Sequence, residues 1–288
     1  MKGPVSGHAE GPLAIICGGG TLPFTVAEAV SRRGREVFIY ALNGWADPAR
    51  VRAYPHRWGA IGQFGRFRRF AREAGCRDVV FIGSLVRPAF SQIRLDLATL
   101  RVLPRIVAAF RGGDNHLLTG IGRIFEDAGF HLVGAHEVAP EILMGEGPLG
   151  AVAPAAEDLA DIALAMQVLR ATGPFDIGQA AVVAGRHVLA VEAAEGTDLM
   201  LARVAALKKA GRIGAAGGVL VKAPKPGQDR RIDLPSIGPE TVEAAARAGL
   251  RGVAVAAGST IVAEPQAVAR AADRAGLFVA GVGKEFEP

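Results

Sequence analysis

Short apolar runs alternate with amphipathic stretches along most of the chain. The runs are rich in Val, Ile, Leu and Ala and are bounded by glycine, proline or charged residues, which is typical of buried strands. The stretches between them repeat apolar positions at a helical spacing. Strands are therefore predicted at 13–17, 36–42, 78–82, 131–134, 180–184, 187–191, 219–221, 252–256, 260–262 and 277–280. Helices are predicted at 24–33, 97–110, 116–128, 156–170, 199–210, 240–248 and 265–275, with one more inside 50–72.

This alternation predicts an α/β protein with two domains. At the N-terminus a strand, a glycine loop, a helix and a second strand follow one another, which predicts a right-handed βαβ unit and a Rossmann-like parallel sheet. In the second half, two apolar runs within 180–191 predict a hairpin and hence a mixed sheet. A stretch rich in glycine and proline at 145–154 marks the boundary. We therefore expect an N-terminal domain over 1–145 and a C-terminal α/β domain over 146–288.

Two glycine-containing loops follow predicted strands of the first domain. Gly18, Gly19 and Gly20 come directly after the first strand, and Gly83 and Ser84 follow the third. Such loops let a phosphate or sugar approach backbone N–H groups at a helix start, although glycines also serve close packing. The first loop lacks the third glycine or alanine of a dinucleotide fingerprint, and the second strand ends without an acid for a ribose. We expect these loops to bind substrate, and we do not expect NAD.

One polar loop in the second domain, stiffened by prolines, contains the strongest candidates for functional residues. Its candidate functional residues are Lys222, Lys225, Gln228, Asp229 and Asp233. Only six of the 33 basic residues in the chain are lysines, and two of those six lie in this loop. A lysine is a compact charge suited to a diphosphate, and two carboxylates suit a Mg²⁺-type ion. The alternative is a surface loop whose charges pair with one another.

A second polar stretch, Glu195-Gly-Thr-Asp198, precedes the helix predicted at 199–210. Thr197 or Asp198 is placed to cap that helix through its side-chain oxygen. The same residues are equally well placed to contact substrate or metal, so both interpretations stay open.

The region 50–72 contains seven arginines. Phe64, Phe67 and Ala71 form an apolar stripe at helical spacing, and the arginines lie mostly off it. This pattern favours an ordinary solvated helix face. The functional alternative is contact with an anionic membrane surface.

The net charge of +5 and the isoelectric point of about 9.6 favour an anionic partner. We expect no nucleic acid, because zinc-finger spacing, aromatic RNP motifs and helix-turn-helix signatures are absent from the sequence. No apolar run reaches the roughly 20 residues of a membrane span, and no signal peptide is evident, so we expect a cytoplasmic protein. Cys17 and Cys76 are expected to be reduced and structural.

Several of these motifs resemble one enzyme family. They are the Gly-Gly-Gly-Thr-Leu-Pro opening, Glu195–Asp198, the run Val221-Lys-Ala-Pro-Lys-Pro-Gly-Gln-Asp-Arg-Arg-Ile-Asp-Leu-Pro235, and Ile237-Gly-Pro-Glu-Thr-Val242. The chain resembles the metal-dependent UDP-2,3-diacylglucosamine pyrophosphatases of lipid A biosynthesis, the LpxI type that is unrelated to calcineurin-like phosphoesterases. The likeness extends from Leu13 to about Gly281, and the lysine–aspartate run is its most specific part.

This resemblance implies hydrolysis of UDP-2,3-diacylglucosamine to UMP and 2,3-diacylglucosamine 1-phosphate, with Mg²⁺ or Mn²⁺ as cofactor. Asp229 would be the prime catalytic or metal-binding carboxylate, with Asp233 and Asp198 as inferred helpers. Lys222 and Lys225 would neutralise the diphosphate. Substrate contacts are expected at Gly18, Gly19, Gly20, Gly83, Ser84, Thr197 and Gln228.

The resemblance also implies a substrate held between two domains and a protein peripherally associated with the inner membrane; whether it forms a homodimer stays open. Two other functions remain open as well. A nucleotide-sugar transferase would release UDP instead of UMP. A non-catalytic lipid carrier would bind the diacylated ligand and leave it intact.

Overall fold

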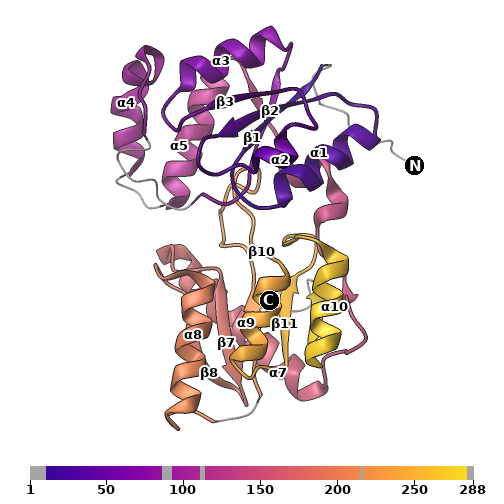
Figure 1. The fold of residues 1–288 in the computed structure, drawn as a ribbon. Coiled ribbons are helices and arrows are strands. Elements are labelled where there is room, and N and C mark those ends of the chain that lie inside the picture. Colours follow the sequence, from indigo (N-terminus) through magenta and orange to yellow (C-terminus); the bar gives the residue numbers. More distant parts are fainter. Residues whose placement is uncertain (1–10, 86–92, 111–113, 215–216, 284–288) are drawn as a thin grey trace, which may run out of the picture. The chain divides into compact units, whose positions relative to one another are not determined.

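The computed structural model describes residues 11–85, 93–110, 114–214 and 217–283. The chain divides into two compact units (Figure 1). The N-terminal unit comprises the chain up to Pro140 together with Asp229–Asp233, and the C-terminal unit comprises Glu141–Gln228 and the chain from Leu234 onward. Both units are built from strands and helices, which confirms the predicted α/β class with two domains.

A five-stranded parallel sheet forms the centre of the N-terminal unit. Its strand order is β3-β2-β1-β4-β5, and every neighbouring pair is parallel. The order of the strands reverses between β1 and β4, as in Rossmann-like folds. The strands are β1 (Leu13–Cys17), β2 (Val37–Leu42), β3 (His56–Gly59), β4 (Asp78–Ile82) and β5 (His131–Leu132).

The helices of the N-terminal unit pack around this sheet (Figure 1). They are α1 (Leu22–Arg32), α2 (Pro48–Val51), α3 (Phe64–Glu73), α4 (Leu97–Phe110), α5 (Asp114–Asp127) and α6 (Ala135–Val138). Phe67 of α3 is fully buried and lies within 5.3 Å, centroid to centroid, of the rings of Tyr40, Phe125 and Phe130. The chain has few aromatic residues, and this cluster uses several of them to fix α3 and α5 on the sheet.

The C-terminal unit has a six-stranded mixed sheet in the order β6-β13-β11-β9-β7-β8. The three central strands β9, β11 and β13 are parallel, while β6, β7 and β8 pair antiparallel with their neighbours. The strands are β6 (Gly147–Pro148), β7 (Ala180–Ala184), β8 (His187–Val191), β9 (Val219–Lys222), β11 (Gly252–Ala256) and β13 (Phe278–Val282). Strands β10 (Ser236–Ile237) and β12 (Ile261–Val262) form a separate parallel pair.

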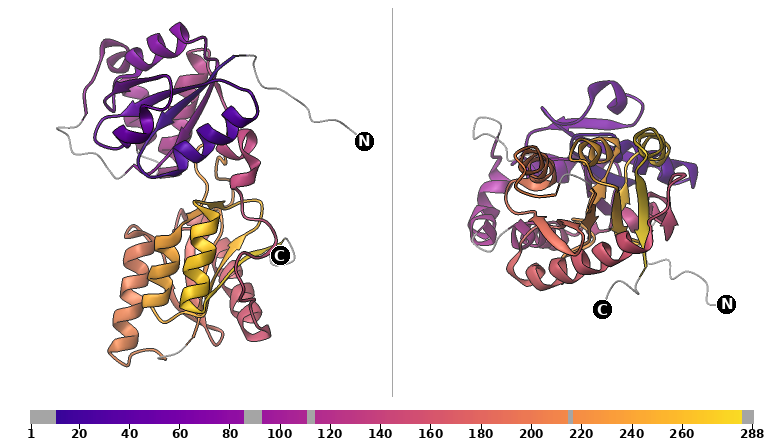
Figure 2. Two further views of the ribbon diagram at one scale, coloured as in Figure 1. Left: turned by 45° about the vertical axis from the view of Figure 1, so that its right-hand side comes forward. Right: turned by 90° about the horizontal axis from the view of Figure 1, so that it is seen from below.

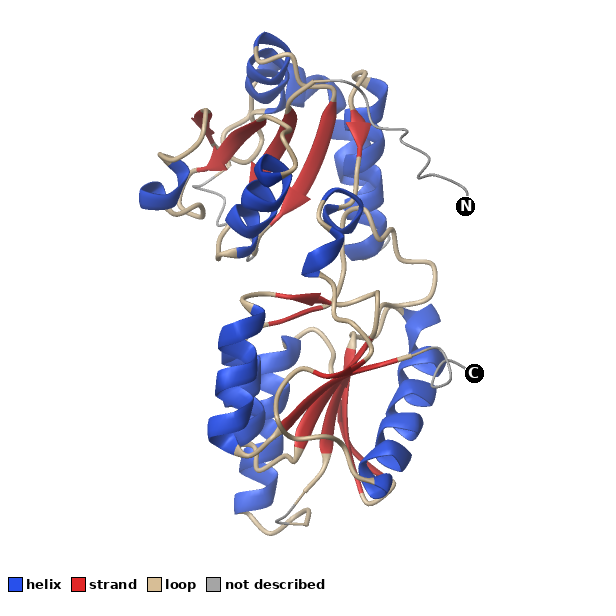
Figure 3. Cartoon of the chain, turned by 90° about the vertical axis from the view of Figure 1, so that its right-hand side faces the viewer, coloured by secondary structure: helices blue, strands red, loops and turns tan. Residues whose placement is uncertain are grey.

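Helices cover both faces of this mixed sheet, as Figures 2 and 3 show. The helices are α7 (Ala156–Thr172), α8 (Gly196–Lys209), α9 (Pro239–Arg247) and α10 (Pro265–Ala275). Side chains of β9 alternate between the two layers: Val219 and Val221 pack with α7, and Leu220 packs with the other three helices. Burial on both faces explains why the central strands are continuously apolar. No helix among the described residues is long and apolar enough to cross a bilayer.

Short 3₁₀ turns at Pro140–Ile142 and Gly173–Phe175 complete the set of elements. The predicted strands and helices correspond to observed ones with small shifts at their ends. The sequence did not predict β3, because His56–Gly59 is a short edge strand without an apolar run. The strand predicted at 260–262 exists as β12, but it belongs to the two-stranded sheet and not to the main one.

The units differ from the predicted domains in two respects, the first being a boundary after Pro140 instead of after residue 145. The sequence places the whole lysine–aspartate loop in the domain over 146–288, whereas Asp229–Asp233 groups with the N-terminal unit. The physical reason is an ion pair between Arg231 and Glu126 of α5, which no local pattern indicates.

Candidate active site

The segment Asp229–Asp233, which we call the acid segment, belongs to the N-terminal unit although it lies in the second half of the sequence. It forms a single turn, because the backbone N–H groups of Ile232 and Asp233 both donate to the carbonyl of Asp229, at 3.0 and 3.1 Å. Arg231 ties this turn to α5 by donating from Nη1 to Glu126 Oε1 at 2.8 Å. The N-terminal unit therefore determines the position of Asp229.

Arg231 also holds the Asp229 carboxylate. Its Nε donates to Oδ1 at 3.0 Å, its Nη2 donates to Oδ2 at 2.8 Å, and its backbone N–H donates to Oδ1 at 3.1 Å. These side-chain bonds keep the pKa of Asp229 below its usual range and raise the pKa of Arg231. Asp229 is thus an anion at neutral pH. A carboxylate with a lowered pKa is a weak general base, but it stabilises neighbouring positive charge well.

His136 lies beside the acid segment, just after β5. A Cβ atom built on Gly134 would be 2.4 Å from His136 Cε1 and 3.2 Å from the Cα of Arg231, so both residues pack against this glycine. Nδ1 of the imidazole is buried and has no hydrogen-bond partner among the described residues. Burial lowers the pKa of His136, and Arg230 adds to this effect while Glu137 opposes it. A neutral imidazole therefore adjoins the acid segment at neutral pH.

The two glycine loops meet at the carboxyl edge of the same sheet. The N–H of Gly19 donates to the carbonyl of Ser84 and the N–H of Ser84 donates to the carbonyl of Gly19, each at 2.9 Å. A Cβ on Gly18 would be 2.9 Å from the Ser84 oxygen, and a Cβ on Gly83 would be 2.8 Å from the Gly18 carbonyl carbon. Close packing therefore accounts for Gly18 and Gly83. Gly20, at φ +85°, has open space where a Cβ would be, and the substrate-binding role of these loops stays a prediction.

These loops follow β1 and β4, between which the strand order reverses. Open α/β sheets bind their ligands at such a point, beyond the carboxyl ends of the strands. The acid segment stands at the end of β5, which is separated from β1 by β4 alone. At ordinary strand spacing this corresponds to about 10 Å. The N-terminal unit thus brings the predicted glycine loops and the predicted aspartates to one edge of one sheet.

In the C-terminal unit, Lys225-Pro226-Gly227-Gln228 forms a tight turn. The N–H of Gln228 donates to the Lys225 carbonyl at 3.2 Å, Pro226 is the second residue, and Gly227 has φ +74°, as a type II turn requires. Gln228 is buried, and its Oε1 accepts the N–H of Lys225 at 2.9 Å. The Gln228 side chain therefore holds the turn that immediately precedes Asp229; its substrate contact stays a prediction.

Both lysines of the loop make polar contacts inside the C-terminal unit. Lys222, at the end of β9, donates from Nζ to the carbonyl of Ser236 at 3.0 Å. Lys225 pairs with Asp176 at 2.5 Å, and its side chain is only 13% exposed. Charge pairing within the unit thus accounts for part of the loop, and a phosphate at Lys225 would have to compete with Asp176.

Helix α8 begins at Gly196 with Glu195 at the N-cap position. The prediction that Thr197 or Asp198 caps this helix is therefore wrong, because both residues lie inside its first turn. Thr197 Oγ1 donates to Glu192 Oε1 at 2.8 Å, and the exposed Asp198 carries a negative charge that suits the helix N-terminus. The substrate contact of Thr197 and the metal contact of Asp198 stay predictions.

The predicted metal ligands are divided between the two units, and their metal contact stays a prediction. Asp229 and Asp233 belong to the N-terminal unit and Asp198 belongs to the C-terminal unit. Within the described ranges, no group of three or more His, Cys, Asp or Glu side chains is placed to hold a metal ion. Each Asp229 oxygen already accepts a hydrogen bond from Arg231, so a cation at Asp229 would have to compete with that guanidinium.

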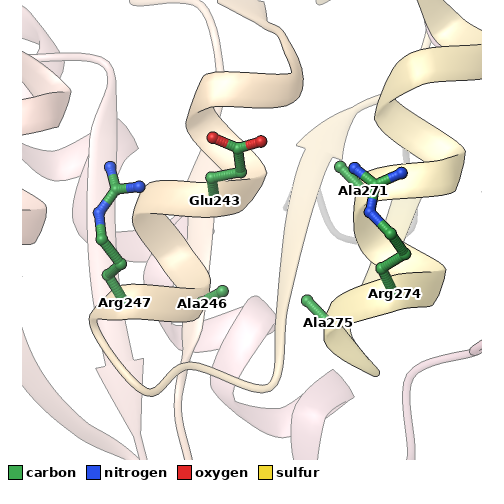
Figure 4. Close-up of a pocket in the computed structure, with 6 residues that line it drawn as sticks. All are labelled: Glu243, Ala246, Arg247, Ala271, Arg274 and Ala275. Carbon is green, nitrogen blue, oxygen red and sulfur yellow. The ribbon is translucent and has the colours of Figure 1, made fainter.

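A shallow depression of about 320 Å³ lies between α9 and α10 (Figure 4). It is lined by Glu243, Ala246, Arg247, Ala271, Arg274 and Ala275. None of the predicted site residues lines it, and it is formed by two helices rather than by strand ends. We assign it no part in the chemistry.

Sequence reasoning missed two residues of the candidate site. Glu126 lies within an amphipathic helix 105 positions away from Arg231, and nothing in its local sequence connects the two. His136 did carry a signal, because it follows a predicted strand end and comes two residues after a glycine. The glycine loops were chosen as candidates because they follow strand ends, and His136 lies at an equivalent position after a strand.

The fold defines a two-unit α/β protein whose N-terminal sheet has its glycine loops and acid segment at the carboxyl edge, where open α/β sheets bind ligands. The chain belongs to the LpxI family: the LpxI N-terminal domain matches residues 12–142 and the LpxI C-terminal domain matches residues 145–280. A Caulobacter vibrioides protein named UDP-2,3-diacylglucosamine pyrophosphatase LpxI is 47% identical over 278 residues, covering 96% of this chain and 99% of that protein. The resemblance seen in the sequence motifs is confirmed.

Two solved structures show a weaker likeness, each at 14% sequence identity and a TM-score of 0.29. One is the Bordetella bronchiseptica enzyme WbmG in complex with NAD, matched over 44% of this chain and 37% of that one. The other is UDP-glucose-4-epimerase from Stenotrophomonas maltophila, matched over 72% of this chain and 64% of that one. Similarity at this level has no bearing on function.

Proposed function

We propose that this protein hydrolyses the pyrophosphate bond of UDP-2,3-diacylglucosamine to UMP and 2,3-diacylglucosamine 1-phosphate in lipid A biosynthesis. The observation that carries the proposal is the 47% identity, over 96% of the chain, to the Caulobacter vibrioides pyrophosphatase. Both LpxI domains match, so the likeness extends to both units. The protein is accordingly an enzyme of the phosphoanhydride hydrolase class.

Asp229 is the residue that we propose at the centre of the reaction. It is an anion because Arg231 lowers its pKa, and the turn of the acid segment fixes its direction. Asp233 closes the same turn and is the proposed helper. Lys222 and Lys225 are the cations that we propose neutralise the diphosphate as charge builds up on the leaving phosphate.

Mg²⁺ or Mn²⁺ is the proposed cofactor. Mg²⁺ commonly uses one or two carboxylates together with substrate phosphates, so the lack of a three-carboxylate cluster among the described residues favours an ion that arrives with the diphosphate. When bound, such an ion neutralises phosphate charge and lowers the pKa of a coordinated water. Calorimetric titration of Mn²⁺ should show weak binding to the free protein and tighter binding when UMP is present.

The glycine loops after β1 and β4 are the proposed contact for the uridine end of the substrate. Their support is their place at the reversal of strand order, together with the open space at Gly20. The neighbouring acid segment would then lie on the diphosphate side.

A turnover assay tests the proposal directly. UMP release from UDP-2,3-diacylglucosamine is measured with and without Mg²⁺ for the wild type, for Asp229→Ala and for the control Asp127→Ala, whose carboxylate is exposed and pairs with Arg105. We expect UMP release from the wild type and the control, and a loss of at least 100-fold in Asp229→Ala. Folded wild-type protein that releases no UMP refutes the hydrolase. Release of UDP would indicate a transferase, and intact bound ligand would indicate a carrier.

A further inference from the structure

Helix α4 exposes apolar side chains on the face that points away from its packing partners. Leu97, Leu100, Pro104 and Val107 recur at the spacing of one helix face, and we call them the apolar stripe. Leu97 is 77% exposed, Leu100 47% and Val107 49%. Of the nine large apolar side chains exposed in the described part of the chain, five lie between Leu85 and Val107. Such a concentration marks an interaction surface, whereas single exposed leucines are ordinary.

The opposite face of α4 is already occupied. Thr99 and Ala109 are buried there, and α4 packs against α5 and α3. Figure 1 shows α4 on the outer side of the N-terminal unit, next to α5. The helix is therefore apolar on two faces while only one of them is covered within its own unit. A helix that is apolar around most of its circumference is normally buried on both sides.

Arginines are abundant on α4, which carries this stripe, and on the neighbouring α3. Helix α3 and residues 93–110 together contain seven arginines and only two acids, Glu73 and Asp96, and the Asp96 carboxylate accepts backbone hydrogen bonds from both helices. By helical position, Arg101 and Arg105 flank the stripe on one side, and Arg105 also pairs with Asp127 of α5 at 2.6 Å. Guanidinium groups are planar and bind phosphates through two parallel hydrogen bonds, so they suit a surface of phosphate headgroups.

Phe70 of α3 adds an aromatic ring to this basic surface. The guanidinium carbons of Arg57, Arg66 and Arg69 lie 5.5, 5.5 and 4.7 Å from the centre of its ring. An aromatic ring enclosed by cations at a half-exposed position resembles the side chains found where a membrane meets water. The basic surface of α3 and the apolar stripe of α4 are held together, because both helices share the Asp96 and Thr99 hydrogen bonds.

We infer that the apolar stripe of α4, together with the arginines of α3 and α4, docks the protein on an anionic lipid bilayer. The leucines and Val107 enter the boundary between headgroups and acyl chains, and the arginines bind lipid phosphates. The inference rests on the proposed function in one respect: a substrate with two acyl chains is delivered from a bilayer. It identifies α4 as the docking element, whereas the sequence had suggested only the arginine-dense region of 50–72.

Charge distinguishes the bilayer from a second copy of the chain. In a two-fold symmetric dimer the same patch meets itself, so the arginines around the stripe would face the arginines of the other copy. The net charge of +5 makes that approach still less favourable. An anionic lipid surface instead complements both parts of the patch.

Co-sedimentation with lipid vesicles tests the inference without reference to catalysis. The wild-type protein is mixed with vesicles of phosphatidylglycerol and phosphatidylcholine in equal parts, and with vesicles of phosphatidylcholine alone. The stripe variant carries Leu97→Ser, Leu100→Ser and Val107→Ser. The matched control carries Leu159→Ser, Phe175→Ser and Leu199→Ser, three side chains that are likewise exposed but lie in the C-terminal unit.

We expect the wild type and the control to bind the anionic vesicles, and the stripe variant to bind at least tenfold more weakly. Arg101→Gln with Arg94→Gln, a second variant without apolar changes, should weaken binding to anionic vesicles and make the remaining binding less sensitive to added salt. Binding by the stripe variant equal to that of the wild type overturns the inference, as does a wild type that ignores both vesicle types. A wild-type dimer that the stripe variant converts to a monomer would assign the face to a second copy instead. UMP release from a water-dispersed substrate, measured on the same samples, shows separately whether the proposed function holds.

Discussion

Replacement of Asp96 by alanine should destabilise the N-terminal unit more than the loss of an ordinary helix cap. Asp96 precedes α4, and its Oδ1 accepts the N–H of Thr99 at 2.8 Å, which is an N-cap bond. Its Oδ2 accepts the N–H of Arg66 at 2.9 Å in the first turn of α3. The own N-cap residue of α3, Gln63, makes no side-chain cap bond, so α3 depends on this carboxylate.

The expected magnitude follows from the two caps. Replacing an N-cap residue by alanine costs about 0.5–2 kcal/mol, typically about 1 kcal/mol. Asp96→Ala removes one such bond from each helix and one acceptor from the buried Thr99 hydroxyl, which donates to Oδ1 at 2.8 Å. We therefore expect a loss of about 2–3 kcal/mol in the free energy of unfolding of the N-terminal unit. Asp47→Ala, which removes a single cap bond at the four-residue helix α2, is the control, with an expected loss of about 1 kcal/mol or less.

Urea denaturation followed by tryptophan fluorescence measures this loss. Both tryptophans of the chain, Trp45 and Trp58, lie in the N-terminal unit, so the signal follows that unit alone. With a slope of about 2 kcal/mol per molar urea, Asp96→Ala should lower the midpoint by about 1 M. A shift no larger than that of Asp47→Ala would refute the shared-cap reasoning.

The same carboxylate should make this stabilisation depend on pH. Burial works to raise the pKa of Asp96, but the hydrogen bonds from Thr99 and Arg66 outweigh it and lower the pKa. For an acid whose pKa is lower in the folded state, the stabilisation is complete at neutral pH and is lost as the pH falls below about 4. The difference between the wild type and Asp96→Asn should therefore shrink in acid.

Three further outcomes are expected. Gly134→Ala should lower kcat in the UMP assay by at least about tenfold, because its Cβ would be 2.4 Å from the His136 ring and 3.2 Å from the Cα of Arg231. The control Gly145→Ala, which has open space at the Cβ position, should behave like the wild type. Burial lowers the pKa of His136 from 6.5, so as the pH falls the imidazole is protonated in the unfolded chain before it is protonated in the folded one. The N-terminal unit should therefore lose stability as the pH falls below about 6.5. Urea titrations of His136→Gln should show less of this loss. Burial raises the pKa of Cys17 to about 12 and that of Cys76 to about 11, so iodoacetamide should label neither thiol at pH 8 until the protein unfolds, as mass spectrometry would show.

The periodic part of the fold could be predicted from the sequence because burial repeats along each element. The strand at Val219–Lys222, for example, is apolar on both faces because helices cover both sides of its sheet. The start of α8 was misjudged by a short distance, since Gly196, at φ +80°, already opens the helix that Thr197 and Asp198 were expected to cap. Such boundaries depend on single backbone angles that a side-chain pattern does not record.

The sequence indicated that the acid segment is a candidate for catalysis, but it did not indicate which unit the segment packs against. Its residue types and its prolines indicated a stiff, charged loop. That Asp229 belongs to the N-terminal unit depends on Glu126 and Gly134, which are remote in sequence and unremarkable in their local context. Tertiary ion pairs of this kind leave no periodic trace, so neither propensity nor spacing reveals them.

The lysine–aspartate loop is one motif in the sequence, but its lysine and its aspartate are held by different partners in different units. Lys225 is held by Asp176 and by the type II turn that Gln228 closes, whereas Asp229 is held by Arg231 and, through it, by Glu126. Oppositely charged side chains on one flexible loop would pair with each other and lose their value for a charged substrate. Separate partners instead hold the lysine and the aspartate in fixed directions within their units, and a ligand at either residue must compete with that partner. In the proposed hydrolysis the lysine would meet the anionic diphosphate and the carboxylate would meet a cation that accompanies it, so substitution of either present partner, Asp176 or Arg231, should change how strongly that charge binds.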